Sequence, residues 1–227
     1  MTTRTSTLTL TERVAEVRTR INLACERSGR DASTVTLIGV SKTFAADAAV
    51  SAFEAGIRDF GENRVQEGAA KAVDLAARGI EPCWHLIGHL QTNKVRAALK
   101  AFAILHAIDS GRLLEAIASA AASPVRVFIE VNVASEASKF GVTPGELPVL
   151  LRTADGLPNV VVEGLMTVAP RVDDGDEVRP VFRTLHGLAE ANGLTKLSMG
   201  MSGDFETAIE EGATHIRVGR AIFGERA

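Results

Sequence analysis

The chain has 227 residues, of which 46% are hydrophobic and 23% charged, and its formal net charge at pH 7 is −3. This composition is ordinary for a globular protein and excludes a disordered, collagen-like or wholly coiled-coil chain. The slightly acidic balance also excludes the broad basic surface that binds nucleic acid or an anionic membrane.

Neither a membrane span nor a secretory signal is expected. The longest stretch without Asp, Glu, Lys or Arg runs only from Pro82 to Asn93, whereas a membrane-spanning helix needs about 20 apolar residues. The first residues lack the apolar segment of a signal peptide. Cys25 and Cys83 lie far apart and fit no metal-binding spacing, which favours free thiols in a reducing compartment. We therefore expect a cytoplasmic protein.

The first expected element is a helix from Thr11 to Arg27. Thr9 and Glu12 have the spacing of a capping box at its start, and Gly29 can end it. Its apolar residues recur at helical spacing and form one face, made of Val14, Val17, Ile21 and Cys25. The pattern predicts an amphipathic helix.

From residue 35 onward, short apolar runs alternate with amphipathic stretches. Eight runs have the character of strands: Val35–Val40, Ile57–Phe60, Cys83–Ile87, Ala103–Ile108, Val125–Val133, Val160–Met166, Lys196–Met199 and His215–Val218. The helical stretches between them are Ala45–Glu54, Arg64–Arg78, Thr92–Lys100, Gly111–Ala122, Pro144–Asp155, Asp176–Ala191 and Phe205–Glu210. Because the strand runs are apolar throughout, we expect a parallel sheet that is covered on both faces.

Two architectures fit this alternation, a closed eight-stranded barrel and an open doubly wound sheet. They differ in where the polar residues that follow the strands would lie. In a barrel these residues meet at one mouth, whereas in an open sheet they scatter along an edge.

Lys42 follows the first run directly. A lysine held beside apolar walls can lose its proton and act as an imine-forming nucleophile. From its position alone, a lysine that simply reaches solvent is the more ordinary interpretation.

Glycine-containing loops follow the last two runs, at Gly200–Gly203 and at Arg217–Arg220. Loops after the seventh and eighth strands are the usual phosphate site of (β/α)8 barrels. A lysine nucleophile with a phosphate site suggests two chemistries. One is a Schiff-base aldolase of sugar phosphates, and the other is pyridoxal phosphate held as an internal aldimine.

His85 and His89 are four residues apart, a spacing that can bind a metal on a helix. Here the two residues span a strand end and Gly88, and no carboxylate stands at a zinc-like spacing from them. We therefore expect packing or hydrogen bonding for both histidines, and no metal site.

Six motifs in order resemble those of pyridoxal phosphate homeostasis proteins, over about Val35–Arg226. They are LIGVSKT at Leu37–Thr43, GENRVQE at Gly61–Glu67, WHLIGHLQTNK at Trp84–Lys94, EVNVASEASKFGV at Glu130–Val142, GLMTVAP at Gly164–Pro170 and LSMGMSGDFETAIEEGATHIRVGRAIFGER at Leu197–Arg226. The chain departs from the GENYVQE of many bacterial members at Arg64.

The resemblance implies a single TIM-type (β/α)8 barrel, like the N-terminal domain of alanine racemase, preceded by a helix. We accordingly expect one domain over residues 1–227, with the helix at 11–27 and the barrel at 35–224.

The resemblance also implies pyridoxal 5'-phosphate on Lys42. Ser202 and the backbones of Gly219 and Arg220 would hold the phosphate, and Arg217 would face the pyridine nitrogen. Four further residues would line the pocket: Asn63, Met166, Ser198 and Met201. The implied role is to bind and balance cellular pyridoxal phosphate without catalytic turnover. We expect a monomer that could supply apo forms of pyridoxal-phosphate enzymes, and no nucleic-acid or membrane partner.

The residues agree with a carrier. Arginine only donates hydrogen bonds, so Arg217 would leave the pyridine nitrogen unprotonated and the cofactor a weak electron sink. Alanine racemase uses a tyrosine and a second domain, but this chain has no tyrosine and we expect no further domain after Ala227. A racemase-like enzyme, or an aldolase that uses Lys42 with Glu130 and Asp109, is the alternative.

Overall fold

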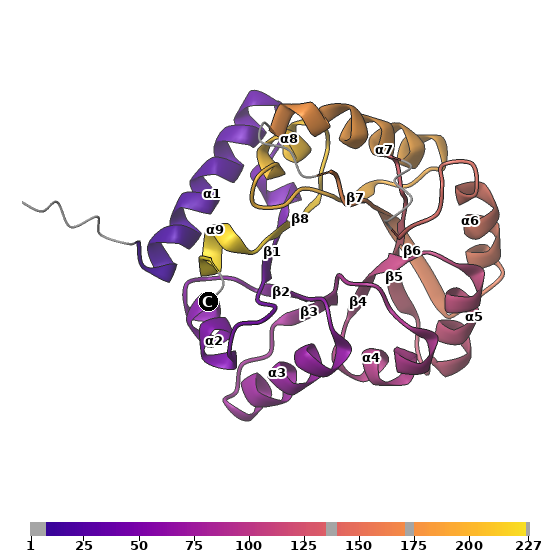
Figure 1. Cartoon of the computed structure of the whole chain (residues 1–227), viewed down its shortest axis with the longest axis horizontal. Helices are drawn as coiled ribbons and strands as arrows, with labels where there is room; N and C mark the ends of the chain where they lie inside the picture. The colour runs from indigo at the N-terminus through magenta and orange to yellow at the C-terminus, as the bar shows by residue number, and fades with distance from the viewer. Residues whose placement is uncertain (1–7, 135–139, 171–174, 226–227) are drawn as a thin grey trace, which may run out of the picture.

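The computed structural model of the chain describes residues 8–134, 140–170 and 175–225. Eight parallel strands close into a barrel in chain order, because β1 pairs with both β2 and β8 (Figure 1). The strands are β1 (Thr36–Val40), β2 (Asp59–Glu62), β3 (Cys83–Leu86), β4 (Ile104–Ile108), β5 (Val125–Glu130), β6 (Val160–Met166), β7 (Lys196–Ser198) and β8 (His215–Val218). The expected (β/α)8 barrel is confirmed, and the open sheet is excluded.

Helices form a ring outside the barrel (Figure 1). They are α2 (Ala46–Glu54), α3 (Val65–Ala77), α4 (Val95–Ala101), α5 (Gly111–Ala120), α6 (Leu147–Asp155), α7 (Arg179–Ala191), α8 (Phe205–Glu210) and α9 (Arg220–Phe223). Short 3-10 turns lie at Ala32–Thr34, Thr92–Lys94 and Gly175–Val178. None of the helices in these described ranges is long and apolar enough to cross a membrane.

The expected N-terminal helix is α1 (Leu10–Arg27). The backbone N–H of Glu12 donates to the Thr9 hydroxyl, and the Glu12 carboxylate accepts from the Thr9 backbone N–H, which completes the capping box. The predicted apolar face is buried, and α1 packs against α8 and α9. Because α9 is only one turn long, α1 covers the part of the barrel wall beside β8 and β1 (Figure 1).

Two strands differ from the sequence prediction for identifiable reasons. β2 extends to Glu62, because that carboxylate is fully buried and hydrogen-bonded to Ser41 and Lys71. β5 ends at Glu130 and not at Val133, since the next residues turn to pair with Val142. Contacts with other segments of the chain therefore set these two ends.

The space inside the barrel is partly polar. A small apolar cluster there contains Ile104, Ala107, Phe128 and Met166. Beside it, polar side chains on four strands are also buried: His85, His106, Ser198, His215 and Arg217. Most other apolar residues pack between the strands and the outer helices. Hydrogen bonds therefore organise the interior beneath the mouth.

Candidate functional site

The turn after β1 carries Lys42 at the mouth of the barrel. Its flanking residues are fixed, because Ser41 is fully buried and Thr43 has a positive φ of 71°. A positive φ is unfavourable for a β-branched residue and persists only where the surroundings enforce it. β8 lies beside β1, and a Cβ added to Gly219 would be 3.4 Å from the Val40 carbonyl oxygen. The Lys42 turn and the loop after β8 are therefore neighbours.

A buried ionic cluster enforces this turn from β2 and α3. The ammonium group of Lys71 donates to the Ser41 carbonyl at 2.7 Å, to Glu62 at 2.7 Å and to Glu67 at 2.9 Å. The Ser41 hydroxyl donates to Glu62 at 2.6 Å, and the Thr43 backbone N–H donates to Glu67. Burial raises the pKa of Glu62, against the hydrogen bonds from Lys71 and Ser41. Both residues that flank Lys42 are thus tied to the cluster.

Arg217, on β8, is the central cation of the interior and is only 4% exposed. Its guanidinium donates to the Ser198 hydroxyl at 2.6 Å and to the Thr167 carbonyl at 2.8 Å. Burial lowers the pKa of Arg217 to about 10, while the Glu130 and Asp204 carboxylates raise it. Arg217 therefore stays charged at neutral pH, and its orientation is set by Ser198 on β7 and by Thr167, which directly follows β6.

A chain of hydrogen bonds runs from Arg217 through the barrel interior to Asp59. Ser198 Oγ lies 2.8 Å from His106 Nδ1, His106 Nε2 lies 2.9 Å from His85 Nδ1, and His85 Nε2 lies 3.0 Å from Asp59 Oδ1. Arg217 can only donate, and an ionised Asp59 can only accept.

The two ends of this chain therefore fix the protons between them. The Ser198 hydroxyl donates to His106, His106 donates from Nε2 to His85, and His85 donates from Nε2 to Asp59. Burial and the neighbouring His85 and His215 hold the pKa of His106 well below its usual value, so this ring is neutral. This chain of hydrogen bonds anchors Ser198, and through Ser198 it anchors Arg217.

Glu130, at the end of β5, is the second unusual group near Arg217. Its side chain is buried, and burial raises its pKa to about 7, although Arg217 lowers it. A carboxyl group with a pKa near 7 can take up or release a proton at cellular pH. The sequence prediction placed Glu130 within the fifth strand run, and its unusual pKa follows from burial.

The loops after β7 and β8 meet at Ser202. The Ser202 hydroxyl accepts from the backbone N–H groups of Gly219 at 3.2 Å and Ala221 at 3.3 Å. The first loop turns sharply at Gly200, whose φ is 91°, and a Cβ there would lie 2.6 Å from the Cβ of Ala208. Backbone donors and a hydroxyl therefore converge at the two predicted phosphate-binding loops.

The other predicted pocket residues occupy different depths. Met166 is buried in the interior cluster, and Ser198 lies beneath Arg217. Asn63 is half-buried just after β2, and its Oδ1 has no hydrogen-bond partner within the described ranges. The Met201 backbone N–H donates to Asp204. The exposed Arg64 is the N-cap residue of α3.

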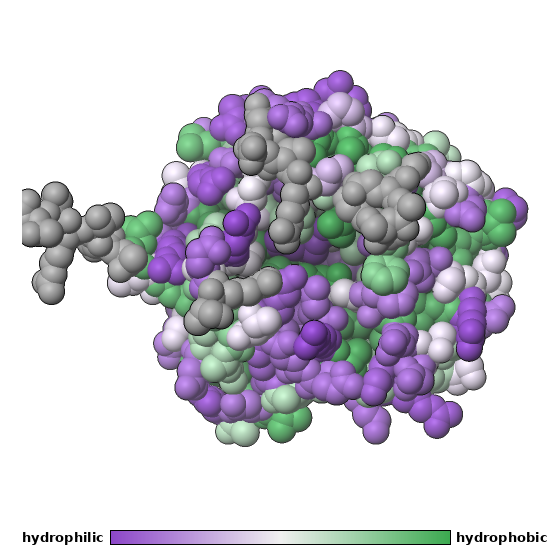
Figure 2. Space-filling model, viewed as in Figure 1, coloured by the Kyte–Doolittle hydropathy of each residue, from purple (hydrophilic) through white to green (hydrophobic). Residues whose placement is uncertain are grey.

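His85, in the third predicted run, and His89, which follows that run, make contacts of the kind expected of them. His85 belongs to the interior chain, and the His89 ring stacks on Phe140 at 4.2 Å and lies 3.2 Å from Asp109. Figure 2 shows that hydrophilic residues gather over β2 and β3 in the view down the barrel.

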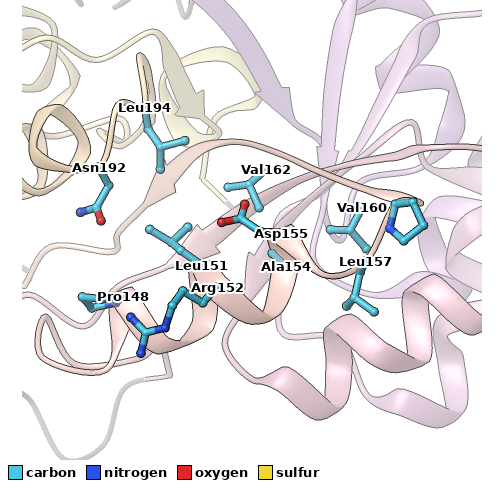
Figure 3. A pocket seen from close by; sticks show the side chains of 11 residues that line it. Pro148, Leu151, Arg152, Ala154, Asp155, Leu157, Val160, Val162, Asn192 and Leu194 are labelled. Carbon is cyan, nitrogen blue, oxygen red and sulfur yellow. The ribbon is translucent and has the colours of Figure 1, made fainter.

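A different pocket, of about 490 Å³, lies outside the barrel beside α6 and β6 (Figure 3). Leu151, Val162 and Leu194 are among its apolar residues, and Arg152 and Asp155 are its charged ones. The predicted site residues do not line this pocket. They lie at the mouth of the barrel or beneath it, and we therefore place the candidate site at the mouth.

Known proteins can now be compared with this arrangement. The family described as "Alanine racemase, N-terminal domain" matches residues 15–227. The pyridoxal phosphate homeostasis proteins of Aquifex aeolicus and Pseudomonas aeruginosa are 43% and 41% identical to this chain. These matches cover 95% and 96% of the chain, and 97% and 96% of the relatives. The chain belongs to the pyridoxal phosphate homeostasis protein family.

Solved structures of the family have the same fold. PipY of Synechococcus elongatus without pyridoxal phosphate is 35% identical and superposes with a TM-score of 0.85, covering 95% of this chain and all of PipY. PipY with pyridoxal phosphate bound is 34% identical, with a TM-score of 0.82. Alanine racemase of Corynebacterium glutamicum, at 22% identity and a TM-score of 0.69, shares the barrel fold over 62% of its own chain.

Sequence reasoning missed Lys71 and His106. Lys71 stands within a predicted amphipathic helix, where a lysine usually faces solvent, yet only 6% of it is exposed. Its position four residues after Glu67 was a local signal of pairing. His106 lies in the middle of a predicted apolar strand and is fully buried. Its partner Ser198 is 92 residues away, so no local pattern could reveal the contact.

Proposed function

We propose that this member of the pyridoxal phosphate homeostasis protein family binds pyridoxal 5'-phosphate reversibly on Lys42 and serves in cofactor homeostasis or carriage, without turning over amino acids. The observation that carries the proposal is the fixed orientation of Arg217, a donor-only cation buried beneath the mouth. The name of the relatives and the pyridoxal phosphate bound to PipY support the choice of ligand.

The residues at the mouth fit the three functional parts of this cofactor. An amine on a turn held from both sides suits the aldehyde. The Ser202 hydroxyl and the backbones of Gly219 and Arg220, on adjacent loops, suit the phosphate. Arg217 suits a pyridine nitrogen that accepts a hydrogen bond. The Oδ1 of Asn63, which has no hydrogen-bond partner among the described residues, is a further polar group available to a ligand at this end.

Bound pyridoxal phosphate supplies an electron sink, and its strength depends on protonation of the pyridine nitrogen. Arg217 keeps its own proton at neutral pH, since its pKa is about 10. It therefore provides no acceptor for a pyridinium proton, and Ser198 and Thr167 prevent it from turning away. We infer that the site favours retention of the cofactor over bond cleavage in bound amino acids.

One observation favours a second candidate, a racemase-like or aldolase-type side activity. Glu130 has a pKa of about 7 and lies where it interacts electrostatically with Arg217, so it could act as an acid or base. The sequence contains no tyrosine, the residue that alanine racemase uses opposite its lysine. If a side activity exists, we expect Glu130→Gln to abolish it while pyridoxal phosphate binding persists.

A carrier must also release its cofactor to a recipient. The loaded protein should activate an apo form of a pyridoxal-phosphate enzyme. Activation by direct transfer should depend on the concentrations of both proteins, and should persist when a scavenger removes free pyridoxal phosphate. Activation that the scavenger abolishes would show that the recipient takes up cofactor only from solution. The same preparations, run by light scattering, test our expectation of a monomer.

A further inference from the structure

We propose that the floor of the barrel, opposite the mouth, is a binding site for a zinc-class divalent cation, held by Asp59, Cys83 and His85. One oxygen, one sulfur and one nitrogen of these side chains lie within 4.8 Å of one another. The proposal does not depend on the function assigned to the mouth.

The strand register brings the three ligands together. Asp59 and Cys83 are direct neighbours at the starts of β2 and β3. His85 is two residues after Cys83, so its side chain lies on the same face of the strand. Asp59 contacts both, through a hydrogen bond with the Cys83 thiol and at 3.0 Å from His85 Nε2. Spacing along the chain could not show a carboxylate beside His85, because it comes from the neighbouring strand.

The three side chains line an open pocket of about 380 Å³. Its other lining residues include the first residues of β1, β4, β7 and β8, which places the pocket at the amino ends of the strands. Asp59 and Cys83 are half-buried, so a cation can enter from solvent and both side chains can rotate. A tetrahedral site needs ligand atoms roughly 3.5 Å apart, so atoms that now lie within 4.8 Å of one another must move closer to bind a cation.

His85 is held as a metal-binding histidine is held. Its ring is 1% exposed, and its Nδ1 lies 2.9 Å from His106 Nε2. This second contact fixes the ring and points Nε2 into the floor pocket, beside Asp59. Metal-binding histidines characteristically have such a hydrogen bond on their other nitrogen.

The donor set and the local charge select the class of cation. Thiolate and imidazole ligands suit zinc and the later transition metals, whereas magnesium and calcium prefer oxygen ligands. The pocket also contains Arg126 and Lys196, which bind Glu163 at 2.6 Å and 3.2 Å. The two positive charges of Arg126 and Lys196 are balanced by the negative charges of Glu163 and Asp59. A cation that enters the pocket therefore meets no net positive charge.

Cation binding forms three bonds, releases one proton to solvent and moves two others between ring nitrogens. The Cys83 thiol proton leaves to solvent as Sγ bonds the metal. His85 must free Nε2, so its remaining proton lies on Nδ1 and points to His106. His106 then accepts at Nε2 and carries its proton on Nδ1, and the Ser198 hydroxyl turns its own proton away from the ring so that its oxygen accepts from Nδ1. The tautomer of His106 therefore reports on occupancy of the floor.

The test is a cobalt(II) titration of the full chain after treatment with a chelator. We expect one equivalent of cobalt to give the near-ultraviolet charge-transfer band of a cobalt–thiolate bond, and zinc, but not excess magnesium, to displace it. Cys83→Ser should remove the band and weaken cobalt binding at least about tenfold, because even residues outside the ligand shell change metal affinity 10- to 100-fold. Cys25→Ser, at the only other cysteine, is the matched control and should change nothing.

Asp59→Asn gives a second variant of nearly unchanged shape, with circular dichroism confirming its fold, and it should also bind at least about tenfold more weakly. Nitrogen-15 spectra should show zinc shifting the His106 proton from Nε2 to Nδ1. A missing band, a band that survives in Cys83→Ser or is lost in Cys25→Ser, or an unchanged His106 tautomer at saturating zinc would overturn the proposal.

Discussion

Two lysines lie near the end of β1, and their surroundings give them different roles. Lys71 directs its ammonium group at three oxygen acceptors, on Ser41, Glu62 and Glu67. All three of its N–H donors are used by these acceptors. The same contacts hold the turn that presents Lys42, so Lys71 is a positioning residue for its neighbour.

This difference predicts the site of covalent attachment. Borohydride reduction of the protein loaded with pyridoxal phosphate, followed by peptide mapping, should find the pyridoxyl group on Lys42. Lys42→Ala should lose the label and retain the cofactor poorly, yet keep its thermal stability, because a half-buried side chain on a turn contributes little to the core. Labelling mainly at Lys71 or Lys94 would show that the assignment is wrong.

The chain of hydrogen bonds inside the barrel predicts the tautomers of two histidines, His85 and His106. In metal-free protein at neutral pH, His106 should be neutral with its proton on Nε2, and His85 should donate from Nε2 to Asp59, because Arg217 only donates and Asp59 accepts. Nitrogen-15 chemical shifts of the imidazole rings measure this directly. Asp59→Asn removes the terminal acceptor charge and should mix the tautomers. The opposite tautomer in the unmodified protein would contradict the direction of the chain.

Glu130 predicts an unusual dependence of stability on pH. Its folded pKa, about 7, lies above the usual value of 4.5. Its contribution to stability is therefore fully present below pH 4.5 and is lost as the pH rises through 7. Glutamine mimics the protonated group. The gain in unfolding free energy of Glu130→Gln over the unmodified, cofactor-free protein should thus grow between pH 5 and 8, by on the order of 3 kcal/mol.

Denaturant titrations at several pH values measure this gain. The matched control is Glu146→Gln, at an exposed carboxylate whose pKa is lowered by hydrogen bonds from Thr143. Its difference from the unmodified protein should not grow in that direction. A Glu130→Gln gain that is constant with pH would mean that Glu130 titrates normally.

At the scale of elements, the loops after β7 and β8 together form the predicted anion-binding site. The β7 loop supplies Ser202, and the β8 loop supplies the N–H groups that its hydroxyl now accepts. Ser202→Ala should weaken pyridoxal phosphate binding by about 1.5–3 kcal/mol, the usual contribution of a hydrogen bond to a charged group. Equilibrium titration by absorbance measures the change, with the exposed Ser123→Ala as control.

Pyridoxal, which has no phosphate, separates this effect from damage to the fold. The unmodified protein should bind pyridoxal much more weakly than pyridoxal phosphate, and Ser202→Ala should not weaken pyridoxal binding further. Equal affinities for the two compounds would remove the case for a phosphate site at these loops.

At the scale of the whole molecule, local patterns left the closed barrel and the open sheet both possible, and the family resemblance selected the barrel. The sequence itself was sufficient for the alternation of strands and helices and for the loops at the mouth. Both depend on local patterns: apolar runs, helical periodicity, and glycines such as Gly200 whose φ only glycine adopts readily. The interior could not be predicted. In the sequence, His106 is a single polar residue within an apolar strand. Its hydrogen-bond partners, His85 on β3 and Ser198 on β7, lie beside it only in the closed barrel.

The floor cluster was missed for the same reason. The sequence prediction considered only the spacing of His85 and His89 along the chain. Asp59 contacts His85 from the neighbouring strand of the sheet. A closed barrel has two ends, and polar residues at strand starts can meet as those at strand ends do. The fold thus places the candidate cofactor site and the candidate cation site at opposite ends of one hydrogen-bonded interior.

The central claim, that the molecule carries pyridoxal phosphate without using it in catalysis, is tested most directly by turnover. Loaded protein should be incubated with a panel of L- and D-amino acids while racemisation, decarboxylation and amine transfer are followed. The fixed, donor-only Arg217 predicts reversible cofactor binding and negligible rates on every member of the panel. A turnover of about 1 s⁻¹ or more on any of them lies in the usual range of enzymes and would contradict the claim.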